Sequence, residues 1–163
     1  MKKISLLLLI GLLCLSLIAC DPNWFNYEKE ELNTDVIRVE LIDYRQPDAK
    51  QINSFLFNKR AFLRFDLFKM MILETLDDAD MPDFFEDLST LGLWTHWIHL
   101  NSPSGRCIRL VYADGSFDVL SSASGDSLVM KYDETGRPLD FIGPMTNETE
   151  FRELIEKHFE SAA

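Results

Sequence analysis

Hydrophobic and polar residues alternate over positions 36–44, where charged side chains separate Ile37, Val39 and Leu41. A period of two with β-branched residues is typical of a β-strand, so we predict a strand here. The segment 46–60 fits only one or two helical turns and predicts no definite element. The hydrophobic positions over 65–76 fit both a helix and a strand. We predict a buried strand from about Leu67 to Leu76.

A helical spacing of hydrophobic residues follows over 77–91, where Phe84, Phe85 and Leu88 lie on one side. Asp80 precedes this pattern as a capping residue, and Gly92 can end the helix. A second helix is predicted near the C-terminus, after a capping-box pattern at 147–150. Its hydrophobic side consists of Phe151, Leu154, Ile155, His158 and Phe159.

Short hydrophobic segments separated by turn residues lie between these helices, at 94–100, 107–112, 117–121, 128–132 and 139–142. The pair Asp114-Gly115 is a strong hairpin signal. A two-residue turn there would place Tyr112 opposite Phe117 and Leu110 opposite Val119 on one apolar face. Gly143-Pro144 is expected to break the last strand. These elements predict an α+β domain, with a mostly antiparallel sheet, a hairpin meander in its C-terminal half, packed by two amphipathic helices.

The first residues have a different pattern, because Lys2 and Lys3 precede an apolar run over 4–18. A basic start with an apolar core of about fifteen residues is typical of a secretory signal peptide, and it is short for a membrane span of about twenty. We predict a cleaved signal peptide at 1–19, a tether at 20–34 and a single α+β domain at 35–163. Trp24, Phe25 and Tyr27 of the tether either rest at lipid headgroups or pack on the domain.

The sequence Leu17-Ile18-Ala19-Cys20 resembles the lipobox of bacterial lipoproteins. The resemblance implies cleavage between Ala19 and Cys20 and attachment of a diacylglycerol to the Cys20 sulfur. It also implies a protein anchored to the cell membrane on its extracytoplasmic face, because two acyl chains give stable anchoring. A fully extended tether would reach about 45 Å from the bilayer. The resemblance covers the N-terminus and transfers no activity to the domain.

The net charge and the number of cysteines restrict the partners and the cross-links that the mature protein can have. Cleavage removes Lys2 and Lys3, which moves the formal net charge from −11 to −13 and leaves 144 residues. Such a charge argues against nucleic acid and against electrostatic attraction to anionic headgroups. Cys107 is the cysteine that remains after loss of Cys14 and lipidation of Cys20, so no internal disulfide is expected.

The residues Gly125-Asp126-Ser127-Leu128 resemble the nucleophile motif of the GDSL hydrolases. In that family the motif lies near the start of an α/β domain, and an Asp and a His follow in a D-x-x-H block near its end. Here the motif lies late in the chain and no such block follows. We interpret it as a turn between two strands.

Two further groups could bind metal. His96, His99 and Cys107 could meet across a hairpin, but a structural zinc needs four ligands and an activated cysteine needs an electropositive setting. Six carboxylates could gather calcium, although Met81-Pro82 breaks the order of an EF-hand loop. They are Asp77, Asp78, Asp80, Asp83, Glu86 and Asp87. We interpret the first group as strand residues and the second as helix capping and a solvated face, and we predict no cofactor.

The preferred partner surface is one face of the hairpin that would contain Trp97, His99 and Arg109, opposite Ile108 and Leu110. Aromatic and arginine side chains are common anchors of protein contacts. We therefore expect a membrane-anchored lipoprotein that binds an envelope protein or an extracellular ligand. The alternatives are an exported hydrolase that uses Ser127 or Cys107, and a structural envelope component without a ligand.

Overall fold

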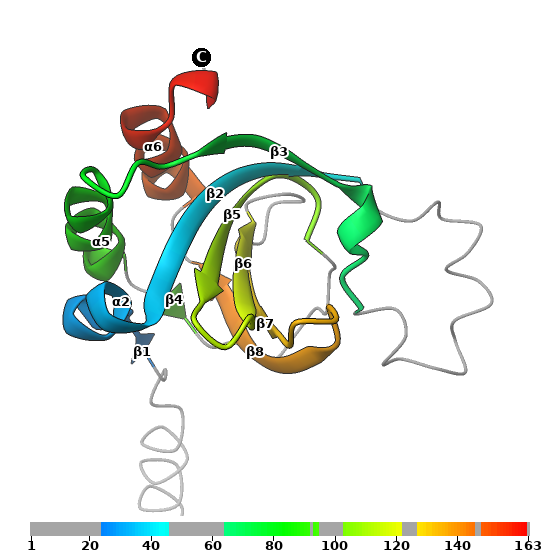
Figure 1. Ribbon diagram of the computed structural model, residues 1–163. Coiled ribbons are helices and arrows are strands. Elements are labelled where there is room, and N and C mark those ends of the chain that lie inside the picture. Colours follow the sequence, from blue (N-terminus) through cyan, green and yellow to red (C-terminus); the bar gives the residue numbers. More distant parts are fainter. Residues whose placement is uncertain are drawn as a thin grey trace, which may run out of the picture.

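A computed structural model describes residues 24–45, 64–91, 93–94, 103–121, 127–145 and 148–162 (Figure 1). The helices are α2 (Lys29–Asp35), α5 (Met81–Thr90) and α6 (Glu148–His158), and short 3-10 turns lie at Leu67–Lys69 and Glu160–Ala162. The strands are β1 (Trp24–Phe25), β2 (Val36–Tyr44), β3 (Met70–Thr75), β4 (Leu93–Trp94), β5 (Gly105–Tyr112), β6 (Phe117–Ser121), β7 (Ser127–Tyr132) and β8 (Pro138–Met145).

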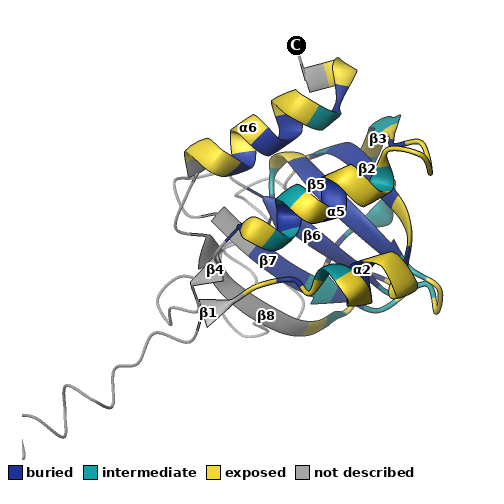
Figure 2. Ribbon diagram, turned by 90° about the vertical axis from the view of Figure 1, so that its left-hand side faces the viewer, coloured by how far each residue is buried: buried dark blue, intermediate teal, exposed yellow. Residues whose placement is uncertain are grey.

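The strands form one sheet in the order β1-β4-β8-β7-β6-β5-β2-β3, and each neighbouring pair is antiparallel. Strands β5 to β8 form the predicted meander, in which each strand pairs with the next along the chain. The three helices lie together along one side of the curved sheet (Figure 2). The predicted α+β class is confirmed, with α2 as a helix that the sequence pattern did not predict.

Successive residues of each strand point to opposite faces of the sheet, and this alternation builds two hydrophobic clusters. Leu41, Ile108 and Leu120 belong to the cluster beneath the helices, together with Phe84 and Phe151. The opposite cluster consists of Ile42, Tyr44, Phe65, Cys107, Val111, Phe117, Val119, Met130 and Tyr132. We call the side of the sheet with this second cluster the aromatic face, because four of its rings contact one another.

The predicted tether is partly a folded segment. Strand β1 pairs with β4, and α2 contacts α5. Tyr27 and Leu32 are buried, and the Tyr27 hydroxyl donates a hydrogen bond of 2.7 Å to Asp118 of β6. The prediction of an extended tether is therefore wrong from Trp24 onward. It failed because α2 has a single buried residue, Leu32, and so carries no hydrophobic period.

The strand predicted over 67–76 corresponds to β3, but the prediction that it is buried is wrong. It lies at the edge of the sheet beside β2, and Met71 and Ile72 are about half exposed. Residues 67–69 form a 3-10 turn instead of strand. An apolar run does not distinguish an edge strand from a central one, because the position in the sheet depends on distant pairing partners.

The β5–β6 hairpin forms at the predicted turn, but its register differs by one residue. Val111 lies opposite Phe117, and Leu110 lies opposite Asp118. The Tyr112 backbone N–H donates to Ser116, and Gly115 has a φ of 86°, so the loop has three residues rather than two. A shift of one residue moves every side chain to the other face. Phe117 consequently packs on the aromatic face, away from Tyr112.

The ends of the other elements agree only partly with the sequence pattern. Helix α5 begins after Asp80, although the Asp80 side chain makes no capping hydrogen bond. Gly143-Pro144 does not end β8, which continues to Met145 with a register shift opposite Leu128 and Val129. The predicted hydrophobic side of α6 is confirmed by burial of Phe151, Leu154, Ile155 and Phe159. Gly92, Asn147, the segment 46–60 and most of 94–100 lie outside the described residues.

Candidate functional site

Three charged side chains meet on the aromatic face, where β2 pairs with β5. Glu40 lies directly opposite Arg109 in this pairing, and Arg38 lies two residues before Glu40 on the same face. Glu40 forms an ion pair with Arg38, whose Nε lies 2.7 Å from Oε1, and accepts a hydrogen bond of 3.1 Å from the Arg109 Nη1. Glu40 is only 1% exposed, so two arginines stabilise a buried carboxylate. We call these three residues the arginine cluster.

Arg109 is the buried member of the arginine cluster, with 9% of its surface exposed. Its guanidinium carbon lies 4.3 Å from the centre of the Phe117 ring, in cation–π geometry. Its Nη1 also contacts the Met70 sulfur at 3.7 Å. Burial lowers the pKa of Arg109, and Glu40 opposes that shift. The Nε atom of Arg109 is buried and has no hydrogen-bond partner among the described residues.

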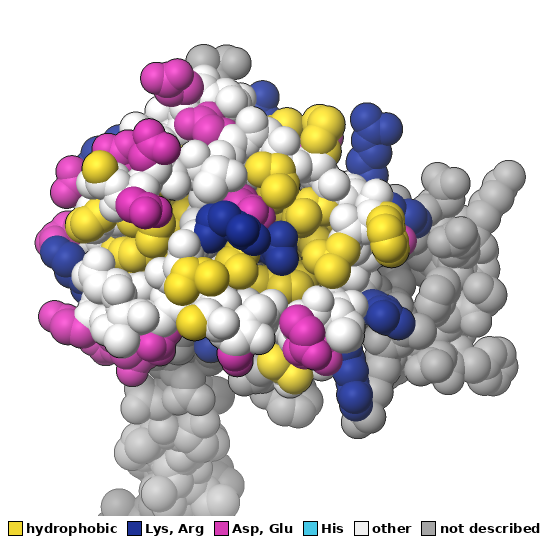
Figure 3. Space-filling model, in the orientation of Figure 1, with side chains coloured by type: hydrophobic (Ala, Val, Ile, Leu, Met, Phe, Trp, Pro, Cys, Tyr) yellow, Lys and Arg dark blue, Asp and Glu magenta, His cyan; other side chains and the backbone are white. Residues whose placement is uncertain are grey.

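Hydrophobic side chains surround the cluster. Figure 3 shows basic side chains over β2 and β5 near the middle of this view, with hydrophobic side chains around them. Arg38 is about half exposed, whereas Phe117 beneath the guanidinium of Arg109 is fully buried. Ile72 of the edge strand β3 is 48% exposed and lies opposite Ile42. The surface thus combines a positive centre with apolar surroundings.

The hairpin predicted between 94–100 and 107–112 is wrong, because β5 pairs with β2 on one side and with β6 on the other. Arg109 lies on the face opposite Ile108 and Leu110, as predicted. It is not an exposed anchor, because Glu40 and Phe117 hold it against the sheet. Trp97 and His99 lie outside the described residues. Sequence reasoning missed Arg38 and Glu40 as partners of Arg109, although their alternation on β2 placed them on one face.

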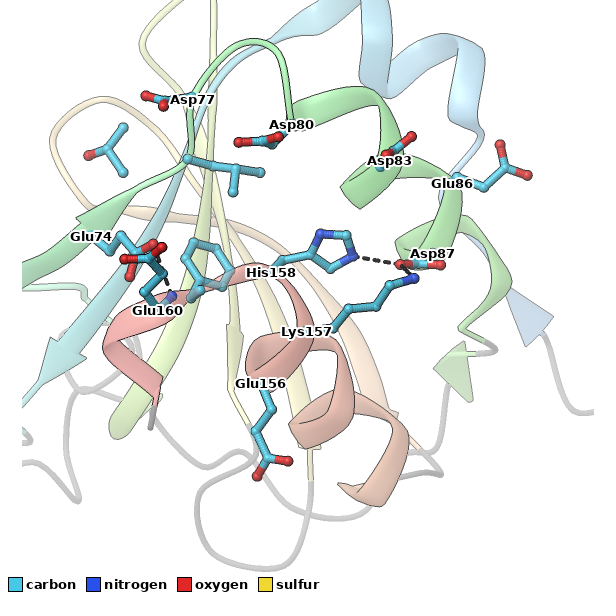
Figure 4. Close-up of a pocket in the computed structure, with 13 residues that line it drawn as sticks. Glu74, Asp77, Asp80, Asp83, Glu86, Asp87, Glu156, Lys157, His158 and Glu160 are labelled. Carbon is cyan, nitrogen blue, oxygen red and sulfur yellow. Dashed lines mark hydrogen bonds and ion pairs between the residues drawn. The ribbon is translucent and has the colours of Figure 1, made fainter.

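A second feature is an acidic cleft between the end of β3, α5 and α6, with a volume of about 790 Å³. Two of its lining carboxylates pair with basic side chains: Glu86 with Lys29 of α2, and Asp87 with Lys157 and His158 of α6. The Lys157 Nζ lies 2.6 Å and the His158 Nε2 lies 2.5 Å from the Asp87 Oδ2 (Figure 4). Hydrogen bonds from Lys157 and then His158 lower the pKa of Asp87. The His158 ring packs edge-on against Phe84, so the interaction joins α6 to α5.

Most of the carboxylates considered as calcium ligands line this cleft. Asp77, Glu86 and Glu156 point in different directions (Figure 4). In the described ranges, no group of three or more His, Cys, Asp or Glu side chains is placed to hold a metal ion. Asp78 does not line the cleft, whereas Asp80, Asp83 and Asp87 do. Asp77, Asp80, Asp83 and Glu86 are exposed, which agrees with the interpretation of a solvated acidic face, although Asp80 makes no capping hydrogen bond.

The two candidate nucleophiles are Cys107, whose surroundings the structure describes, and Ser127, for which it gives the backbone position. Cys107 is fully buried, and burial raises its thiol pKa to about 12. Its sulfur donates to the carbonyl oxygens of Ser104 and Gly105. A thiol with so high a pKa is a poor nucleophile, because the thiolate is the reactive form. Ser127 begins β7 opposite Met145, while Gly125, Asp126 and His96 lie outside the described residues.

Comparisons with protein-family models, with curated proteins and with solved structures found no match. In the part of the chain that the structure describes, no helix has the length and hydrophobicity needed to cross a membrane.

Proposed function

We propose that this protein is a lipoprotein, anchored by Cys20 to the extracytoplasmic face of the cell membrane, and that its folded domain acts by binding. The support for the anchor is the basic start, the apolar run and the lipobox-like Leu17-Ile18-Ala19-Cys20. Cleavage after Ala19 and lipidation of Cys20 would leave the domain outside the membrane. Its partner is an envelope protein or another extracytoplasmic ligand.

The observation that favours binding is the arginine cluster on the aromatic face. A half-exposed Arg38 and a largely buried Arg109 share one carboxylate, while Ile72 supplies exposed apolar surface nearby. Arginine within apolar surroundings is typical of binding sites, since it combines ionic, hydrogen-bonding and stacking contacts. The buried thiol of Cys107 is an argument against a cysteine hydrolase.

The anchor is tested by the intact mass of the membrane-extracted protein. We expect wild type to lack residues 1–19 and to carry a diacylglyceryl adduct, and Cys20→Ala to lack that adduct. Cys14→Ala and Cys107→Ala are matched controls that should retain the lipid, because each removes a different sulfur. An unprocessed wild-type chain, or a lipid-free chain cut elsewhere, would overturn the proposed anchor.

Binding is distinguished from its alternatives by complementation of a strain that lacks the protein. A Ser127→Ala/Cys107→Ala chain should complement if the domain binds, and should fail if it is a hydrolase that uses either residue. An Arg38→Gln chain should complement poorly if the arginine cluster binds the partner. Full complementation by Arg38→Gln would favour a structural component without a ligand at this surface.

A further inference from the structure

The charge of the arginine cluster suits one additional anion. Arg38 and Arg109 carry two positive charges, and Glu40 carries one negative charge, so the cluster has a net charge of +1. This positive centre occurs in a chain whose formal net charge is −11. One further carboxylate would neutralise the cluster, whereas a multiply charged anion would be repelled by Glu40 and by the acidic remainder of the protein.

The hydrogen bonds of Arg109 leave one edge of its guanidinium incomplete. Glu40 accepts from Nη1, which leaves the edge that includes Nε. A carboxylate pairs with a guanidinium most strongly through two parallel hydrogen bonds, and the edge formed by Nε and Nη2 offers that geometry. The Nε of Arg109 is buried without a partner in the part of the chain that the structure describes, and an unsatisfied buried donor is costly. The Met70 sulfur contacts Nη1, which is not part of this edge, and its side chain is flexible.

The surroundings of the cluster suit an alkyl chain. Ile72 exposes about half of its surface, and Met70 is only partly buried beside the second hydrophobic cluster. Both belong to β3, the edge strand that pairs with β2 from Glu40 to Tyr44. A hydrocarbon chain along β3 would cover the exposed apolar surface of Ile72 while its head group reached the arginines.

We propose that the arginine cluster binds the carboxylate of a long-chain fatty acid and that the alkyl chain lies along β3. This inference rests on the proposed function of a binding domain held at the membrane, where such amphiphiles are concentrated. Arg109 and Arg38 hold the carboxylate, Glu40 fixes the two guanidinium groups, and Met70 and Ile72 contact the chain.

The test uses photolabelling of the full chain in membranes and soluble fractions of expressing cells. The probe is hexadecanoic acid with a diazirine in its chain, and the matched probe is hexadecyltrimethylammonium with the same diazirine. After irradiation the protein is purified, digested and analysed by mass spectrometry. We expect the carboxylate probe to label peptides from 36–44 or 67–75. The cationic probe should label these peptides at least about tenfold less, because one charge-assisted hydrogen bond changes an affinity by about that factor.

Variants test the role of the arginines. Arg38→Gln removes one exposed positive charge from the cluster, while Arg152→Gln removes one from the exposed Arg152–Glu156 pair on α6. Arg109→Lys keeps the charge beside Glu40 but removes the guanidinium edge. We expect labelling to fall about tenfold in Arg38→Gln and Arg109→Lys and to stay unchanged in Arg152→Gln. Circular dichroism identifies any variant that has unfolded, and Arg38→Gln keeps the Glu40–Arg109 pair intact.

The proposal is overturned if both probes label the same peptides equally, if Arg38→Gln is labelled like wild type, or if the adducts map to α5 and α6. The intact mass of the same samples reports the anchor separately. A chain without diacylglycerol that still shows carboxylate-dependent labelling would refute the anchor alone. A lipidated chain without such labelling would refute the fatty-acid site alone.

Discussion

Replacing Tyr27 by phenylalanine tests whether the segment after β1 is fixed to the sheet. The Tyr27 hydroxyl donates a hydrogen bond of 2.7 Å to Asp118, and both residues are almost fully buried. The change keeps the ring and its packing but removes the hydroxyl. A hydrogen bond to a buried charged group contributes about 1.5–3 kcal/mol, so we expect the free energy of unfolding to fall by that amount.

The assay is urea denaturation of the purified protein, followed by circular dichroism. Tyr112→Phe is the matched control, since the Tyr112 hydroxyl donates to the same Asp118 oxygen at 2.9 Å. The double variant should lose more stability than the sum of the single variants, because the remaining hydroxyl compensates in each single variant. A loss below about 0.5 kcal/mol for Tyr27→Phe would refute the reasoning, because a change of that size is typical of exposed positions.

Three further predictions follow from buried groups and turns. The Cys107 thiol should resist a thiol-specific reagent in the native protein and react after unfolding, and rapid native labelling would show that it is not buried. Burial and then Asp118 raise the pKa of Tyr112, so the unfolded chain loses its proton first and stability should fall as the pH rises above about 10. Urea midpoints at pH 8 and pH 11 measure this fall in stability, which should be smaller in Tyr112→Phe. Equal midpoints at the two pH values would contradict the raised pKa. Gly136→Ala should cost more than about 3 kcal/mol, because its Cβ would lie 2.1 Å from the Phe65 carbonyl oxygen at a φ of 77°. Gly105→Ala, at a φ of 71° with open space around it, should cost only about 1 kcal/mol in the same denaturation assay, and equal losses would refute the steric explanation.

Local patterns predicted the elements whose signal lies within a few residues. The alternation of Ile37, Val39 and Leu41 located β2, and the helical spacing of Phe84, Phe85 and Leu88 located α5. Loop geometry was less predictable, because Asp114-Gly115 is compatible with both a two-residue and a three-residue turn. Only the backbone hydrogen bonds of the loop decide between these registers.

The arginine cluster shows why the candidate site was only partly predictable. The sequence placed Arg109 opposite the apolar side of its strand, and the structure agrees. The pairing of Arg109 with Glu40, 69 residues earlier, depends on β5 lying beside β2. Neither periodicity nor turn residues encode that strand order, since it results from how distant hydrophobic surfaces pack together.

The early start of the folded domain limits how far a lipidated chain can move. β1 begins at Trp24, four residues after Cys20, and a chain of that length spans at most about 14 Å. With an acylated Cys20, the domain would remain within about one small-protein diameter of the bilayer surface. Its search for partners would then be two-dimensional, as it diffuses with its lipid. Partners confined to the same leaflet would be met far more often than those in bulk solution, because confinement to a surface layer raises their effective concentration.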